Sequence, residues 1–224
     1  ALEDIEVCLK TQVSYVLSRR GQGAYSYLSF AHWCDKKEYC KHYLELKEQE
    51  YKSVIKKALS RQNNAEINEK LRADRKKYPP IWLSVDLLTF GQVVNLIELM
   101  SKSNKKYIAD FFECSNIELI SWLKCVNLIR NICAHDSRLL DFKCKNNLVY
   151  FPTLHNRYNI LPTSPRSDVY NTFLTLQCFL SKTQYAILHN TVLKRLSYLD
   201  KYLSKRGYPI HTNTILSTLG FPNN

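Results

Sequence analysis

Apolar residues recur every three or four positions along most of the chain, which is the spacing of an amphipathic α-helix. In residues 2–20 this apolar stripe ends at a basic pair followed by glycine, a common helix stop. The stripe consists of Leu2, Ile5, Leu9, Val13 and Val16. The pattern therefore predicts that the chain opens with a helix.

Helical spacing continues through the rest of the chain. It predicts helices over residues 24–34, 37–60, 81–100 (interrupted at 89–91), 104–113, 116–135, 168–187, 189–206 and 212–219. Residues 61–78 are the most polar stretch, and loops are predicted at 136–147 and 152–165, with a short extended piece at 148–151. With only 5 Gly and 7 Pro in 224 residues, the turns of an all-β fold are scarce. We therefore predict a mostly α fold.

We predict that residues 1–224 form a single domain, because no stretch rich in Gly or Ser separates independent parts. Within it we distinguish an N-terminal helical part (residues 1–80), a core (81–145) and C-terminal helices (146–224).

The charge balance favours a polyanionic partner. The chain has 32 Lys and Arg against 20 Asp and Glu, a formal net charge of +12. Such an excess most often serves nucleic acid, with an acidic membrane surface as the second candidate. The residues that we consider for RNA contact are Arg75, Lys76, Lys77, Lys105, Lys106, Lys194, Arg195, Lys205 and Arg206.

The amphipathic stretch from Val192 to Arg206 could bind an acidic membrane surface. We expect instead that its Leu and Tyr face packs on the core while its Lys and Arg face meets phosphate. No stretch approaches the roughly 18 apolar residues of a membrane span, and the first residues lack the apolar core of a secretory signal. We therefore expect RNA, and no membrane, as the partner.

The eight cysteines include no Cys-x-x-Cys pair, and several lie in apolar helical runs. Cysteines in such runs behave as small buried apolar residues, so a reducing cytoplasmic location fits best. His32, Cys34, Cys40 and His42 are residue types that bind zinc, but their spacing suits a helix poorly. We favour an aromatic helix junction there, and predict no metal and no cofactor.

The end of the predicted helix 116–135 collects Arg130, Asn131 and His135. Asn131 and His135 share a face, while Arg130 lies about 100° from Asn131. The rest of this helix is so apolar that we expect it to be buried on most sides, where an unpaired cation costs several kcal/mol. Either an internal acid satisfies these groups or they face a pocket for an anion. Cys133 and His135, two residues apart, point away from each other and do not form a hydrolase pair.

This trio suits transesterification of RNA. The 2′-hydroxyl must lose a proton to attack phosphorus, and the 5′-oxygen must gain one. Histidine transfers protons near neutral pH, and arginine can hold the phosphate oxygens. A chance match, or a histidine that is merely structural, is the alternative for so short a pattern.

Three blocks resemble the Abi-like (abortive infection, AbiD/AbiF-type) family of the HEPN superfamily. They are Pro80-Ile81-Trp82 through Leu88-Thr89-Phe90-Gly91, then Ser121-Trp122-Leu123, then Arg130 through Leu139. The resemblance implies a HEPN-type helical bundle with additional N- and C-terminal helices and a bacterial anti-phage toxin.

The same resemblance implies a homodimer that cuts RNA without metal, leaving a 2′,3′-cyclic phosphate. Arg130 and His135 would be catalytic with Asn131 as their polar companion, and Arg138 would support the motif or touch phosphate. The alternative is a non-catalytic RNA-binding module that holds a structured noncoding RNA.

Overall fold

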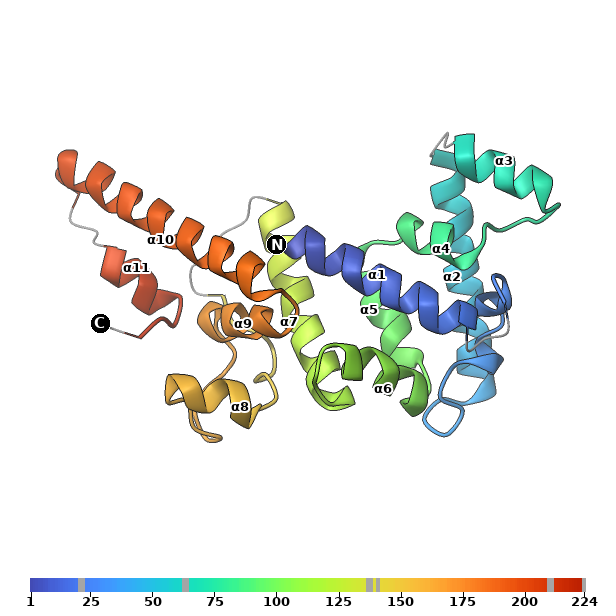
Figure 1. The fold of residues 1–224 in the computed structure, drawn as a ribbon, viewed down its shortest axis with the longest axis horizontal. Coiled ribbons are helices and arrows are strands. Elements are labelled where there is room, and N and C mark those ends of the chain that lie inside the picture. The colour runs from blue at the N-terminus through green and yellow to red at the C-terminus, as the bar shows by residue number, and fades with distance from the viewer. Residues whose placement is uncertain (20–22, 62–64, 136–138, 140–141, 209–211, 223–224) are drawn as a thin grey trace. The chain divides into compact units, whose positions relative to one another are not determined.

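The computed structural model describes residues 1–19, 23–61, 65–135, 139, 142–208 and 212–222. These residues contain eleven α-helices, five short 3₁₀ turns and one isolated bridge between Cys34 and Met100, and no strand (Figure 1). The predicted mostly α fold is therefore confirmed.

Two compact units make up the chain. Glu6–Asn116 forms one, which we call the N-terminal unit, and Ala1–Ile5 joins Ile117–Asn224 in the other, the C-terminal unit. The single-domain organisation stays a prediction. Each unit is described by itself below.

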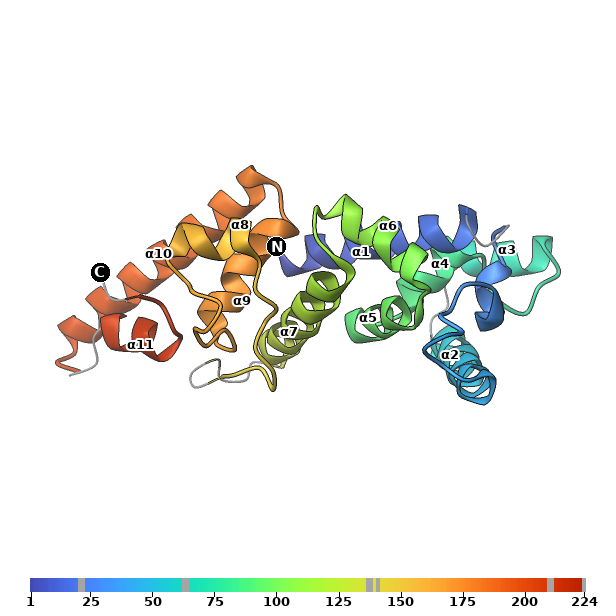
Figure 2. The ribbon, with the colours of Figure 1, turned by 90° about the horizontal axis from the view of Figure 1, so that it is seen from below.

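The N-terminal unit is built from six helices. They are α1 (Leu2–Arg19, from Glu6 onward), α2 (Lys41–Arg61), α3 (Ala65–Ala73), α4 (Ile81–Ser84), α5 (Phe90–Leu99) and α6 (Lys102–Phe111), and each is also seen from below in Figure 2. The predicted interruption at 89–91 is where α5 begins, because Thr89 and Gln92 form a reciprocal capping box. The buried Tyr27 hydroxyl ties the start of α4 to the core, bonding to the Pro79 carbonyl (2.6 Å) and the Ser84 hydroxyl (2.8 Å).

The prediction of a helix at residues 24–34 is wrong. The structure has two 3₁₀ turns there, Ser26–Leu28 and Phe30–His32. Tyr27, Phe30 and Trp33 lie three residues apart and are all buried. Ser29 between the two turns is extended, and Trp33 follows the second turn, so no single helix carries the three rings. The apolar spacing is close to that of an α-helix, but two short turns joined by an extended residue bury these side chains.

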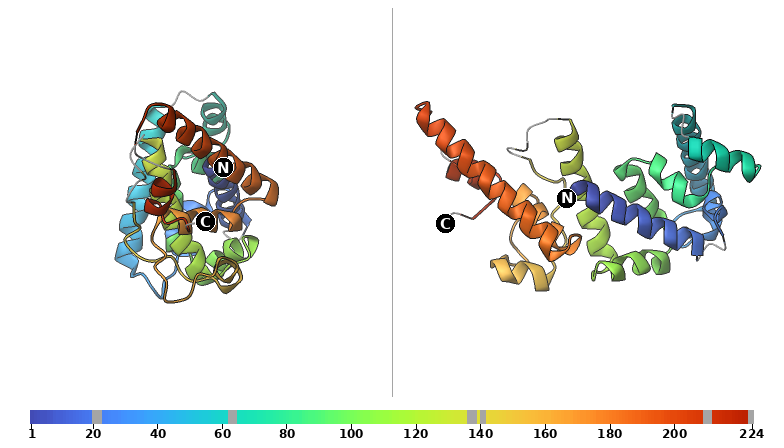
Figure 3. Two further views of the ribbon diagram at one scale, coloured as in Figure 1. Left: turned by 90° about the vertical axis from the view of Figure 1, so that its left-hand side faces the viewer. Right: turned by 45° about the horizontal axis from the view of Figure 1, so that its top comes forward.

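The C-terminal unit contains α7 (Asn116–Ala134, from Ile117 onward), α8 (Pro152–His155), α9 (Val169–Thr175), α10 (Lys182–Lys205) and α11 (Thr212–Thr218). The bounds of α7 and α11 agree with the prediction within one residue. Figure 3 shows α10 as one unbroken helix with α11 beside its C-terminal half.

Two predicted boundaries in the C-terminal unit are wrong. The helix predicted at 168–187 ends with α9 and a 3₁₀ turn at Leu176–Cys178, and α10 begins at Lys182. Ser181 and Gln184 form a capping box that starts the new helix: each accepts a hydrogen bond from the backbone N–H of the other (3.2 and 3.0 Å). The loop predicted at 152–165 contains α8, which opens on Pro152.

Across the described part of the chain, every helix is too short or too polar to span a lipid bilayer.

Candidate active site at the end of α7

The predicted motif lies on the last turns of α7, and this part of the helix is not buried as expected. Its buried side chains are Leu119, Trp122, Leu123, Cys125 and Val126. From Asn127 onward every side chain is half-buried or exposed. The motif is therefore carried on a helix end that leaves the core, and water as well as protein can solvate its charges.

One face of α7 presents a row of exposed side chains. Lys124, Leu128, Asn131 and His135 are exposed and follow one another at intervals of four, three and four residues. This spacing keeps them within about 60° of each other around the helix axis. The His135 N–H donates to the Asn131 carbonyl (3.1 Å), so the helical path continues to His135. We call these four residues the exposed α7 stripe.

Arg130 does not belong to the exposed α7 stripe. It is half-buried, and five residues of helix place it about 140° around the axis from His135. The predicted pairing of Asn131 with His135 on one face is consistent with the structure, and so is the offset of Arg130. Arg138 lies outside the described residues.

The chain that follows the motif is fastened back onto α7. The Val149 N–H donates to the Ser121 hydroxyl (3.0 Å), and the Trp122 indole N–H donates to the Val149 carbonyl (3.3 Å). Cys144 is buried against Cys125, and the hydrogen bond between the two thiols, together with burial, raises the pKa of Cys125. The motif therefore lies between the body of α7 and a segment that is hydrogen-bonded back to the same helix.

Arg166 binds backbone carbonyls of the segment between residues 148 and 164. No sequence pattern had indicated this role. Its side chain is only 8% exposed, yet it faces no carboxylate within the described contacts. Its Nε donates to the Leu148 carbonyl (2.9 Å), and one terminal nitrogen donates to the carbonyls of Leu161 (3.1 Å), Pro162 (2.8 Å) and Ser164 (2.8 Å). A guanidinium satisfied by backbone carbonyls alone holds a loop in one conformation.

His155 is a second residue that the sequence analysis missed. It is fully buried on α8, and its Nδ1 accepts the Phe151 N–H (2.8 Å). Burial lowers the pKa of His155, so the imidazole is held neutral, and Nε2 has no hydrogen-bond partner. Its ring stacks on Tyr150, and the Arg166 guanidinium lies 5.5 Å from the centroid of the Tyr150 ring. His155 therefore supports the same loop as Arg166.

The predicted RNA contacts in the N-terminal unit differ in accessibility. Arg75, Lys76 and Lys77 are exposed after α3, with the Lys76 ammonium 5.5 Å from the Tyr25 ring centroid. Lys106 is exposed and paired with Asp110 (2.7 Å).

Lys105 is different, because it is buried inside the N-terminal unit. Its ammonium donates to the Glu98 carbonyl (3.0 Å) and lies 3.6 Å from the Glu38 carboxylate. In this structure Lys105 holds α6 against the end of α5, and its charge is not offered to phosphate.

The predicted contacts in the C-terminal unit, Lys194, Arg195, Lys205 and Arg206, are all exposed on α10 or at its end.

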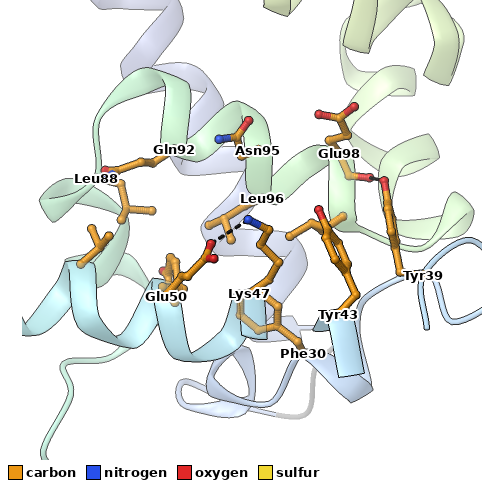
Figure 4. Close-up of a pocket in the computed structure, with 13 residues that line it drawn as sticks. Phe30, Tyr39, Tyr43, Lys47, Glu50, Leu88, Gln92, Asn95, Leu96 and Glu98 are labelled. Carbon is orange, nitrogen blue, oxygen red and sulfur yellow. Dashed lines mark hydrogen bonds and ion pairs between the residues drawn. The ribbon is translucent and has the colours of Figure 1, made fainter. Parts of the chain in front are cut away.

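A groove of about 420 Å³ lies between α2 and α5 in the N-terminal unit (Figure 4). Lys47 projects into it but is paired with Glu50 (2.7 Å) and lies 5.6 Å from the Tyr43 ring centroid. Tyr43 in turn stacks on Tyr39 (5.4 Å). Since Glu98 also lines the groove, its charged side chains are two acids and one base. It is a poor site for phosphate.

Within the described ranges, no three His, Cys, Asp or Glu side chains gather as a metal ion would require. His32, Cys34, Cys40 and His42, the zinc alternative, form no such group. All eight cysteines carry free thiols, and Cys34 is buried next to the aromatic turn.

Fold and site together define a basic, mostly α class of protein with an arginine and a histidine at the end of a helix. A sequence model of the family described as "Abi-like protein" matches residues 1–141. This match covers well over half of the chain, so the chain belongs to the Abi-like family, and membership implies a role in abortive infection defence. No significant match was found among curated proteins or solved structures.

Proposed function

We propose that this Abi-like protein is a metal-independent endoribonuclease of the HEPN type that acts in bacterial anti-phage defence. The observation that carries the proposal is the Arg130–His135 pair at the exposed end of α7, inside the region that matches the family. Solvent access at His135 suits a group that must exchange protons with substrate. Half-burial suits Arg130, because a partly desolvated guanidinium binds phosphate oxygens more strongly.

The proposed reaction needs two proton transfers and one anion site. A base, for which His135 is our candidate, removes the proton of the RNA 2′-hydroxyl, whose oxygen attacks the adjacent phosphorus. The bond to the 5′-oxygen breaks, and that oxygen receives a proton from an acid. Arg130 stabilises the charge on the phosphoryl oxygens, and Asn131 contacts the substrate from the same face as His135. The products are a 2′,3′-cyclic phosphate and a 5′-hydroxyl.

We also propose that the active form is a homodimer. Leu128 is 42% exposed in the middle of the exposed α7 stripe, between polar neighbours of the motif. An apolar side chain in that position is a natural interface contact. A second copy packed on the stripe would bring the Asn131 and His135 side chains of both copies to one interface, whereas each Arg130 lies about 140° around its own helix from His135.

Cleavage in excess EDTA tests the nuclease. Labelled single-stranded and hairpin RNAs are incubated with the wild type, His135→Ala, Arg130→Ala and the matched control His189→Ala, an exposed histidine on α10. We expect both motif variants to lose roughly 10²-fold or more in rate, while the control keeps the wild-type rate. Equal cleavage by all four proteins would overturn the assignment.

One observation favours the non-catalytic alternative. The basic residues of α10 are exposed and could bind RNA whether or not the Arg130–His135 motif cleaves it. If the wild type and His135→Ala bind RNA equally and neither cuts it, the protein is an RNA-binding module.

A mixing experiment tests the homodimer. If each site combines Arg130 of one copy with His135 of the other, a mixture of Arg130→Ala and His135→Ala chains regains activity, because one site of each mixed dimer is intact. Leu128→Asp should convert the dimer to a 26.3 kDa monomer in light scattering. No recovery on mixing would rule out a shared site.

A further inference from the structure

Helix α10 has an unusual division of its surface. Its half-buried side chains recur at helical spacing and form a single packed face: Tyr185, Leu188, Val192, Leu196, Leu199, Asp200 and Leu203. None of its residues is fully buried, although the helix is 24 residues long. Most of the circumference therefore faces solvent.

The opposite face of α10 combines cations with aromatic rings. Lys194, Tyr198, Lys201 and Lys205 are all exposed and lie within about 60° of one another on the helix. Tyr198 is 67% exposed, and Tyr202, one turn further on, is 41% exposed. The expectation that these tyrosines pack on the core beside the leucines is wrong. We call Lys194, Tyr198, Lys201, Tyr202 and Lys205 the α10 stripe.

Charge on this part of the helix is not compensated by neighbouring acids. Asp200 is the only acid between Lys182 and Arg206. Its carboxylate turns to α11, where it accepts hydrogen bonds from the Thr212 N–H (3.1 Å) and hydroxyl (2.8 Å). The α10 stripe is therefore complementary to a polyanion.

The tyrosines decide which polyanion fits. Tyr198 and Tyr202 are about 6 Å apart along the helix axis, and each offers a ring that a base can stack on. The Arg206 guanidinium lies 4.5 Å from the Tyr202 ring centroid, so cation and ring form one platform. Paired bases in a duplex keep their faces inside the helix, and lipid headgroups have no such faces. Only unpaired bases can use this surface fully.

We propose that the α10 stripe is a docking site for single-stranded RNA, separate from the cleavage motif. It lies outside residues 1–141, so the family match does not account for it. The stripe holds phosphates with its lysines and stacks bases on Tyr198 and Tyr202 without selecting sequence. The inference rests on the proposed function only in taking RNA as the strand that binds.

The test measures binding alone, with oligonucleotides that the proposed reaction cannot cut. Fluorescence anisotropy follows the intact wild-type protein with a 2′-O-methylated single strand, the corresponding duplex and anionic phosphatidylglycerol vesicles, over a range of salt. Because no 2′-hydroxyl is present, failure of binding and failure of cleavage are separate results. We expect the single strand to bind best.

Two variants isolate the stacking contribution. Tyr198→Leu with Tyr202→Leu keeps apolar area and helix propensity but removes the rings, and we expect affinity to fall roughly 10-fold or more. Tyr198→Phe with Tyr202→Phe keeps the rings and should bind within about 2-fold of the wild type. Far-ultraviolet circular dichroism shows that each variant keeps its helices. Equal affinities of the Leu and Phe variants would overturn the proposal.

A second pair of variants isolates the phosphate contacts. Replacing Lys194, Lys201 and Lys205 with Gln should lower the slope of log affinity against log salt by about 2, at about 0.7 per phosphate contact. The matched control replaces Lys37, Lys41 and Lys57, three exposed lysines of the N-terminal unit. Tighter binding of duplex or vesicles than of the single strand, or an equal loss in the control, would overturn the proposal.

Discussion

Arg166→Ala should destabilise the segment that returns from the motif to α7. The wild-type side chain donates four hydrogen bonds to backbone carbonyls between 2.8 and 3.1 Å, and it is 92% buried. Truncation removes the donor and leaves the carbonyls of Leu148, Leu161, Pro162 and Ser164 to find new partners. Leu148 is itself fully buried, so water reaches its carbonyl with difficulty.

The magnitude follows from the cost of each lost bond. A hydrogen bond to a charged group contributes about 1.5–3 kcal/mol, so four would sum to about 6–12 kcal/mol. That sum overcounts, because three of the carbonyls belong to an exposed loop and water can enter the space that the side chain leaves. We therefore count the bond to Leu148 fully and the others in small part, which predicts a loss of about 3–4 kcal/mol.

Hydrogen exchange monitored by mass spectrometry localises the effect. Peptides covering residues 142–166 should exchange faster in Arg166→Ala by roughly 10²- to 10³-fold, while peptides of the N-terminal unit serve as an internal reference. Arg157→Ala, an exposed arginine of the same segment, is the control and should change stability by less than about 0.5 kcal/mol. If exchange over 142–166 is unchanged in Arg166→Ala, the carbonyl cluster does not hold the segment.

Three further predictions follow from buried polar groups. Lys105→Met should cost about 1–3 kcal/mol in urea unfolding, since it removes the shorter of two hydrogen bonds to the Glu98 carbonyl together with the ion pair to Glu38, whereas Lys106→Met should cost less than about 0.5 kcal/mol. Tyr27→Phe removes a hydroxyl with two partners and should cost about 1–3 kcal/mol; an unchanged midpoint would show that the hydroxyl is dispensable. The lowered pKa of His155 means that the unfolded chain binds more protons than the native one below about pH 6.5, so stability should fall as pH drops through that range. His155→Asn should flatten this pH dependence, and an identical slope in the variant would assign the acid sensitivity elsewhere.

Helical periodicity predicted the parts of the fold in which one face packs and the other does not. It placed α1, α7 and α11 within one residue at each end, because each has a regular apolar stripe. It failed at residues 24–34, where Tyr27 and Phe30 lie in two separate 3₁₀ turns although their spacing of three residues is close to that of an α-helix. It also joined α9 to the start of α10, because the capping box at Ser181 reads as an ordinary polar interval.

The candidate site was predictable in position but not in environment. Residue types and spacing marked the end of α7, yet the apolar content of the helix indicated burial where the structure has exposure, as at Leu128. An apolar residue can face a core, a partner or solvent, and composition does not distinguish these. Arg166 and His155 were missed because their partners are backbone carbonyls and amides of an irregular loop, which leave no pattern in the sequence.

The central claim is that the RNA supplies its own nucleophile at a site formed by Arg130 and His135. The most direct measurement uses a labelled RNA that the wild type cuts in EDTA, resynthesised with a single 2′-deoxy nucleotide immediately before the cleaved bond. The proposal predicts that this bond is no longer cut, while other cleaved bonds in the same strand are cut as before. Unchanged cleavage at the 2′-deoxy position would mean that water attacks phosphorus, and would contradict the transesterification mechanism.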